Sequence, residues 1–157
     1  KEENRLDRSM IKIICVGKLK EKYLIEAIKE YKKRLSKYTK LEIIELPDYN
    51  YDQVKTKIEE GKNILSKISE KDYVVTLEIN GKELDSICLS SFIDSNISKN
   101  ITFIIGGSNG LSDDVLKRAN YSLSFSKLTF PHQLFRVLLL EQIYRSFKIM
   151  NNESYHK

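Results

Sequence analysis

Short apolar runs alternate with longer segments of helical periodicity along this sequence, and this alternation constrains the fold more than any other feature. Residues 11–16 (IKIICV) and 101–105 (ITFII) are β-rich and almost wholly apolar, as strands covered on both faces should be. Similar runs predict further strands at residues 41–46, 72–79 and 121–125. The segments in between predict helices at residues 20–38, 54–68, 85–97, 113–119 and 131–150. We therefore expect an α/β fold, with a mostly parallel sheet of five to six strands flanked by helices.

The loops after three of these strands have unusual compositions. Residues 106–110 (GGSNG) hold three glycines in five positions, so the backbone there can approach a ligand closely. In residues 123–132 (LSFSKLTFPH), apolar side chains alternate with Ser and Thr where a surface loop should be polar. Such a loop can wall an apolar slot for a base such as adenine, although a ligand-free turn and a loop folded onto the core explain the same patterns. Since ligands of parallel sheets bind at the carboxyl ends of strands, we expect residues 77–81, 106–110 and 125–130 to form a binding site.

The common nucleotide-binding motifs are absent from the sequence. The turn after the first strand, residues 17–20 (GKLK), has one glycine and lacks the GxGxxG fingerprint of dinucleotide-binding domains. No GxxxxGK[ST] phosphate loop occurs anywhere. These absences count against ordinary NAD and ATP binding. A flavodoxin-like nucleotide or small-molecule enzyme remains an alternative that only the α/β alternation suggests.

The net charge of +5 is distributed unevenly. Residues 18–40 carry nine Lys and Arg against three Glu, whereas residues 41–126 carry nine basic and fourteen acidic side chains. Residues 127–157 return to five basic and two acidic ones. Basic ends around an acidic middle favour one surface that faces a polyanion, although a solvated lysine-rich helix face gives the same pattern.

The last predicted helix is apolar nearly all round at its start, in residues 134–140. One sheet face cannot cover such a helix, so we expect the surplus face to contact a second copy in a homodimer. Arg136 interrupts this run, and it is either paired with a carboxylate or aimed at a phosphate or a base.

The remaining sequence features concern membrane segments, cysteines and domain organisation. No apolar stretch approaches the ~20 residues of a membrane helix, and no secretory signal is apparent, so we expect a cytoplasmic protein. Cys15 and Cys88 have neither metal-site spacing nor a disulfide framework, and we predict no metal. Residues 1–9 are interpreted as a charged leader, and residues 10–157 as a single domain.

Five segments in order resemble one family of enzymes. They are residues 10–23 (MIKIICVGKLKEKY), 76–82 (TLEINGK), 105–111 (IGGSNGL), 122–133 (SLSFSKLTFPHQ) and 155–157 (YHK). This pattern is similar to the bacterial ribosomal RNA large subunit methyltransferase H family, a minimal member of the SPOUT class of knotted methyltransferases. The resemblance covers residues 10–157.

The resemblance implies a fold, a reaction and a set of site residues. It implies a carboxy-terminal trefoil knot that binds S-adenosylmethionine, and a homodimer that methylates N3 of a pseudouridine in 23S ribosomal RNA on the assembled ribosome. The implied cofactor contacts are Leu77, Gly106, Phe125, Ser126, Lys127, Leu128, Thr129 and Phe130. The tail at residues 155–157 is expected to reach the active site, either that of its own subunit or that of the neighbouring one.

We assign expected roles to the candidate catalytic and RNA-binding residues. N3 of pseudouridine must lose a proton, and His156 is the first candidate for the general base, with His132 the second. Tyr155 is expected to stack on the target base. Candidates for RNA contacts are Lys29, Lys32, Lys33, Arg34, Lys37, Arg136 and Lys157. The alternative function is a non-enzymatic ribosome-associated factor that uses the same basic surface.

Overall fold

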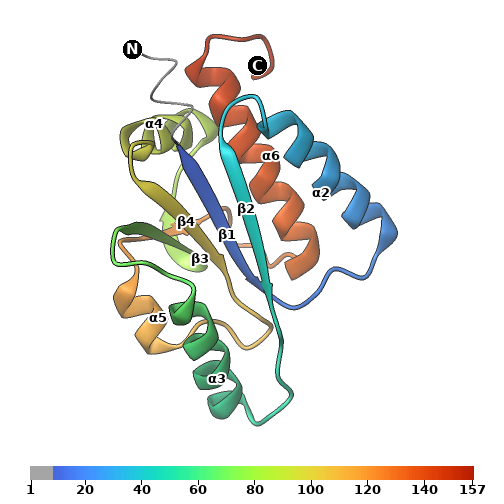
Figure 1. Ribbon diagram of the computed structural model, residues 1–157, viewed down its shortest axis with the longest axis vertical. Coiled ribbons are helices and arrows are strands. Elements are labelled where there is room, and N and C mark those ends of the chain that lie inside the picture. Colours follow the sequence, from blue (N-terminus) through green and yellow to red (C-terminus); the bar gives the residue numbers. More distant parts are fainter. Residues whose placement is uncertain (1–8) are drawn as a thin grey trace.

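The computed structural model describes residues 9–157 as a five-stranded sheet with helices on both faces (Figure 1). The strands are β1 (Met10–Val16), β2 (Lys40–Leu46), β3 (Asp72–Glu83), β4 (Asn100–Ile105) and β5 (Tyr121–Ser124). They lie in the order β2-β1-β4-β3-β5, and every neighbouring pair is parallel. The predicted α/β fold with a mostly parallel sheet is confirmed.

Three helices cover one face of the sheet and two cover the other. The helices are α2 (Lys22–Leu35), α3 (Gln53–Ser66), α4 (Ser86–Asn96), α5 (Asp113–Arg118) and α6 (His132–Met150). Side chains of α2, α4 and α6 share one core with Ile11, Ile13 and Phe103, whereas α3 and α5 share the second core with Ile14 and Val16. β1 is therefore buried on both faces, as its apolar sequence predicts.

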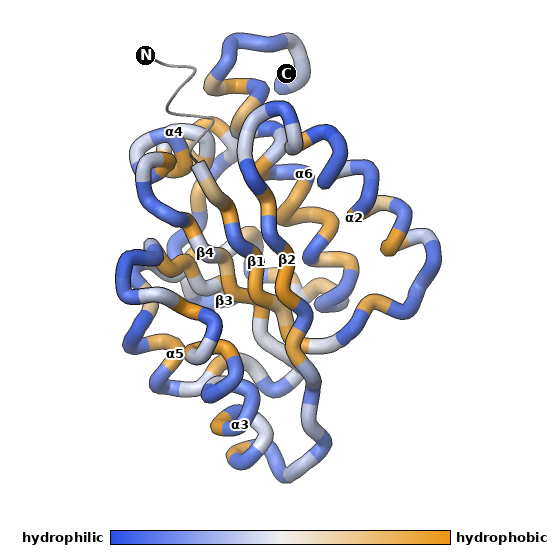
Figure 2. Tube along the Cα trace, viewed as in Figure 1, coloured by the Kyte–Doolittle hydropathy of each residue, from blue (hydrophilic) through white to orange (hydrophobic). Residues whose placement is uncertain are grey.

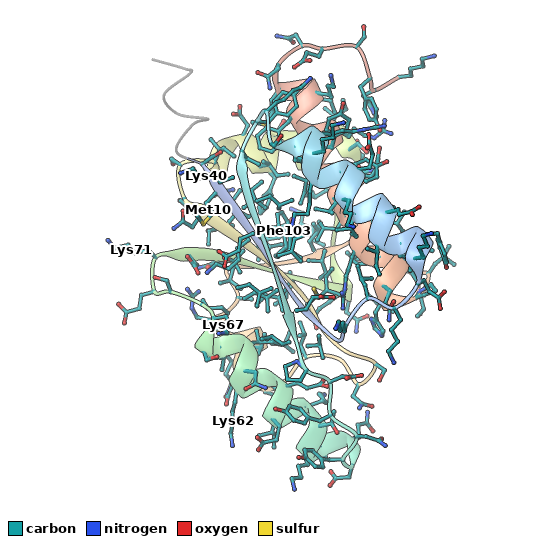
Figure 3. The ribbon with its side chains drawn as sticks, turned by 45° about the vertical axis from the view of Figure 1, so that its right-hand side comes forward. Met10, Lys40, Lys62, Lys67, Lys71 and Phe103 are labelled. Carbon is teal, nitrogen blue, oxygen red and sulfur yellow. The ribbon has the colours of Figure 1, made fainter. Side chains whose placement is uncertain are left out.

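The figures illustrate this layering. The tube in Figure 2 is most hydrophobic along the strands, whereas the helices also carry hydrophilic stretches. Phe103 of β4 lies near the middle of the sheet, and Met10 and Lys40 lie side by side where β1 and β2 begin (Figure 3). Figure 3 also shows that Lys62, Lys67 and Lys71 extend away from the molecule on the side of α3. No helix within residues 9–157 is long and apolar enough to cross a membrane.

Local hydrogen bonds fix where several helices begin. The carboxylate of Asp52 accepts the Lys55 N–H and caps α3, and Asp85 caps α4 by accepting the Cys88 N–H. α2 is shorter than the predicted 20–38, because residues 36–38 form a turn that ends the helix at Leu35.

The predicted end of the third strand is wrong. β3 does not end at residue 79 but continues to Glu83, because its pairing with β5 resumes after a register shift between Leu77 and Lys82. The Asn80-Gly81 pair, just after the predicted end, lies within this irregularity. Of the predicted leader, residues 1–8 lie outside the described residues. Ser9 is buried, and its hydroxyl lies 2.8 Å from the Thr39 hydroxyl.

Candidate active site

A pocket of about 330 Å³ lies at the carboxyl ends of β3, β4 and β5. The end of β3 contributes residues 77–80, and the loop after β4 contributes Gly106, Gly107, Ser108, Gly110 and Leu111. The loop after β5 and the first turn of α6 complete the lining with Phe125, Ser126, Leu128, Thr129, Phe130, His132 and Phe135. The three segments predicted to form a binding site therefore converge, in the volume range of small-molecule sites.

Aromatic rings build one wall of this pocket. The ring of Phe135 lies 4.9 Å from that of Phe125 and 6.1 Å from that of Phe130, measured between centroids. The loop before α6 is held by its own hydroxyls, since Ser124 Oγ donates to Ser126 O at 3.0 Å and Leu128 N–H donates to Ser126 Oγ at 3.0 Å. Leu128 remains 69% exposed at the rim. The alternating apolar loop thus walls the pocket, and its Phe125 also packs against the core.

The glycine-rich turn brings backbone close to the pocket. A Cβ atom on Gly106 would lie 2.9 Å from Leu111 Cδ2, and Gly110 has a positive φ of 83°. The turn is closed by a hydrogen bond from Gly110 N–H to Gly107 O at 3.0 Å. A side chain at Gly106 would clash with Leu111, and one at Gly110 would strain the backbone. Both positions therefore favour glycine.

The predicted cofactor residues can be compared with this lining. Leu77, Gly106, Phe125, Ser126, Leu128, Thr129 and Phe130 line the pocket, whereas Lys127 is exposed and does not. The predicted binding segments included Ile79 and Asn80 but neither Leu111 nor Phe135, which also line the pocket. The apolar character of these two residues, close to the predicted loops, was the signal that could have found them.

His132 is the one imidazole that lines the pocket of its own chain among residues 9–157. Partial burial lowers the pKa of His132, and the nearby charge of Arg136 lowers it further. Both effects favour the neutral ring at physiological pH. His132 is the first residue of α6, where the helix dipole also disfavours positive charge.

Glu60 of α3 lies behind the glycine-rich turn. Its side chain is 4% exposed, and a Cβ atom on Gly107 would lie 3.0 Å from Glu60 Oε1. Tyr49 N–H donates to Oε2 at 3.1 Å, but Oε1 has no hydrogen-bond partner. Burial raises the pKa of Glu60, and the Tyr49 hydrogen bond offsets part of this effect. Sequence reasoning missed this residue, because its surroundings come from distant segments.

Arg136 closes the neighbouring part of the same sheet edge. Its guanidinium pairs with Glu45 Oε2 at 2.8 Å and donates to Val16 O at 3.1 Å and Gly17 O at 2.7 Å. The side chain is 3% exposed. Of the two sequence-based interpretations, the structure therefore supports carboxylate pairing. The expected RNA contact of Arg136 is corrected to a structural role at the ends of β1 and β2.

The carboxy-terminal tail does not enter the pocket of its own chain. Tyr155 packs edge-on against Tyr144 with centroids 5.0 Å apart, and its hydroxyl donates to Glu141 Oε1 at 3.1 Å. His156 Nδ1 lies 3.0 Å from Arg145 Nη1. Because Glu141 follows His132 by nine residues, the tail lies roughly 14 Å along α6 from the pocket.

The predicted RNA-binding side chains of α2 lie on the side of the molecule that carries the tail. Lys29, Lys33 and Lys37 are exposed, and Arg34 pairs with Glu30 at 3.0 Å. The Arg34 guanidinium also lies 5.6 Å from the centroid of the Tyr144 ring, which contacts Tyr155. The basic helix and the tail therefore share one surface.

No group of three or more His, Cys, Asp or Glu side chains within residues 9–157 is arranged to hold a metal ion. Cys15 is buried and Cys88 is exposed, and both are free thiols.

Comparisons with known proteins agree with the sequence resemblance. A family model described as a predicted SPOUT methyltransferase matches residues 10–156. The chain is 55% identical to ribosomal RNA large subunit methyltransferase H 1 of Clostridium perfringens (strain SM101 / Type A), over 94% of this chain and 99% of that protein. It is 57% identical, with the same coverage, to ribosomal RNA large subunit methyltransferase H of Clostridium botulinum (strain Alaska E43 / Type E3). The chain therefore belongs to the SPOUT methyltransferases, in the family of ribosomal RNA large subunit methyltransferase H.

Proposed function

We propose that this methyltransferase transfers the methyl group of S-adenosylmethionine to N3 of a pseudouridine in 23S ribosomal RNA, on the assembled ribosome in the cytoplasm. The names of its relatives support the RNA class of the substrate. The observation that carries the proposal is the convergence of three strand-end loops on one apolar pocket beside a glycine-rich turn.

The pocket suits S-adenosylmethionine in size and chemistry. Its volume of about 330 Å³ and its Phe125, Phe130 and Leu128 side chains fit an apolar slot for an adenine ring. The close backbone at Gly106 offers main-chain groups to the polar parts of the ligand. When bound, S-adenosylmethionine supplies an activated methyl on a sulfonium, so the residues of the chain have mainly to align it with the attacking nitrogen. Lys127 retains a proposed role at the rim, since it adjoins lining residues.

We propose the trefoil knot of the SPOUT fold for the carboxy-terminal part of the chain. β5 lies at the edge of the sheet beside β3, and the segment after it passes along the pocket wall before α6 begins. α6 then packs against both α2 and α4. This course supports the threading expected for the family.

We propose that the active enzyme is a homodimer in which the tail of one subunit completes the pocket of the other. The position of Tyr155 and His156 on α6, away from their own pocket, supports this division. In this arrangement Tyr155 and His156 act at the target base, and Lys157 contacts the RNA. Exposed Leu134, near the pocket end of α6, belongs to the apolar surface available to a second copy.

The basic residues of α2 supply phosphate contacts in this proposal. Lys29, Lys33, Arg34 and Lys37 carry positive charge on the surface that also holds the tail. Such contacts bind RNA without sequence preference and weaken as salt concentration rises.

The direct test is incubation of ribosomes that lack the modification with the enzyme and methyl-labelled S-adenosylmethionine, followed by mapping of the label. We expect one labelled pseudouridine in 23S RNA. Label in another RNA or at another atom contradicts the proposed substrate. Failure to bind the cofactor at millimolar concentration favours the non-enzymatic factor instead.

Deletion of residues 155–157 tests whether the pocket binds the cofactor while the tail acts in methyl transfer. We expect methylation to be abolished while cofactor binding, measured by calorimetry, stays nearly intact. Unchanged turnover in this truncated protein removes the catalytic assignment of Tyr155 and His156.

A further inference from the structure

Arg145 holds the two aromatic side chains of the tail in one hydrogen-bonded cluster. Its Nε and Nη2 donate to Glu141 Oε1 at 3.0 and 2.6 Å, and its guanidinium carbon lies 4.7 Å from the centroid of the Tyr155 ring. The third nitrogen, Nη1, lies 3.0 Å from His156 Nδ1. Glu141 also accepts the Tyr155 hydroxyl at 3.1 Å, so each member of the cluster restrains the others.

The chemistry of the guanidinium decides which imidazole nitrogen carries the proton. Arginine has five N–H donors and no acceptor, so it can bond to His156 only by donating to an unprotonated Nδ1. A neutral imidazole has one protonated and one unprotonated nitrogen. The neutral ring of His156 beside Arg145 therefore carries its proton on Nε2, and its lone pair is occupied by Arg145.

We propose that Arg145 is a positioning residue that fixes His156 as the Nε2–H tautomer, so that His156 donates a hydrogen bond to a carbonyl oxygen of the target base instead of accepting its N3 proton. The inference rests on the proposed function and replaces the expected general-base role of His156 with that of a donor.

A donor at this position suits the reaction. Loss of the N3 proton to water leaves negative charge that is shared with the two carbonyl oxygens beside N3. An N–H group aimed at one of these oxygens stabilises that charge in a site sheltered from water. The N3 lone pair then bonds to the methyl carbon as the carbon–sulfur bond breaks, and a neutral thioether leaves.

Two substitutions of His156 distinguish a donor from a base. The side-chain amide of Gln can place an N–H near the position of Nε2 but cannot accept a proton at neutral pH, whereas Ala offers neither group. We expect His156→Ala to lower kcat on ribosomes by about 100-fold, the usual effect of losing one such donor, and His156→Gln to stay within about tenfold of wild type. Equal losses in the two variants overturn the donor role.

The tautomer itself can be read by NMR of the folded protein with ¹⁵N-labelled histidine. The sequence has two histidines, so a His132→Gln variant assigns the signals of His156. We expect the Nε2–H pattern at about pH 8 in the wild type, and a mixture of tautomers in Arg145→Met, with kcat lowered and cofactor affinity unchanged. An Nδ1–H pattern in the wild type overturns the inference. These NMR results do not depend on activity, so failure of the wild type to methylate ribosomes overturns the proposed function separately.

Discussion

Two parts of the same sheet edge differ in this molecule, because a side chain closes one and the other forms a pocket. The carboxyl ends of β1 and β2 are sealed by Arg136, whose buried guanidinium bonds to Glu45, Val16 and Gly17. The ends of β3, β4 and β5 instead open into a pocket of about 330 Å³. A parallel sheet offers a binding crevice along this edge. Here one buried arginine occupies the part at β1 and β2, which we call the closed end. The part at β3, β4 and β5 is the open end.

The two parts also differ in how completely their buried charged side chains are hydrogen-bonded. Arg136 is almost fully hydrogen-bonded, since only Nε lacks a partner, and it stabilises the closed end. Glu60, behind the open end, keeps one carboxylate oxygen without a partner and has a raised pKa. Each end thus has one buried polar atom without a partner, but Arg136 makes three hydrogen bonds and the Glu60 carboxylate makes one.

The largest expected effect is on the free energy of unfolding, when Arg136 is removed from the closed end. Arg136→Met removes a hydrogen-bond donor from Val16 O, Gly17 O and Glu45. Glu45 keeps the Leu19 N–H, and we expect the free energy of unfolding to fall by about 3 kcal/mol. Urea denaturation measures this change. Arg34→Met is the matched control, because the Arg34–Glu30 pair is exposed and its loss should cost under about 0.5 kcal/mol. Equal losses in the two variants contradict a special role for the closed end.

Substitution in the open end should affect binding more than folding. Phe125→Ala removes part of the aromatic wall, and we expect the Kd for S-adenosylmethionine to rise about tenfold or more, because apolar contact with the ligand is lost. Calorimetry provides the measurement. Val54→Ala, at an exposed position of α3 outside the pocket, should leave the Kd unchanged. An unaltered Kd in Phe125→Ala shows that the ligand binds elsewhere.

Much of this arrangement could be predicted from the sequence, and the reasons for the failures are physical. Apolar runs and the composition of residues 106–110 and 125–130 are local signals, so the sheet and the converging loops could be predicted. The partners of Arg136 and the burial of Glu60 depend on residues from distant segments, and no local pattern encodes them. The same holds for the extension of β3, which pairing with β5 imposes on an Asn-Gly sequence that resembles a turn.

Glu60 predicts a pH dependence that distinguishes the two ends. A carboxyl whose pKa is raised by folding favours the folded state while protonated, and this contribution is lost as the pH rises through the raised pKa. We therefore expect Glu60→Gln to gain stability relative to wild type as the pH rises above about 4.5, until the carboxyl is ionised in the folded state as well. Glu59→Gln, on the same helix but partly exposed, should show no such trend in parallel melts. A flat difference for Glu60→Gln refutes the prediction.

The smallest effect concerns thiol reactivity. Burial raises the pKa of Cys15, on β1 beside the closed end, to about 11, whereas Cys88 is exposed. We expect native protein to be alkylated at Cys88 but not at Cys15, because the thiolate is the reacting form. Mass spectrometry of the labelled peptides detects this difference. Rapid labelling of Cys15 in the wild type argues against a sealed end.

Hydrogen exchange with and without S-adenosylmethionine tests the contrast between the two ends most directly. We expect the ligand to protect backbone amides in residues 77–80, 106–111 and 125–130 together, with no change at residues 16–20 and 46–48. Protection at the ends of β1 and β2, or none anywhere at millimolar ligand, contradicts the assignment of the methyl-donor site to the open end.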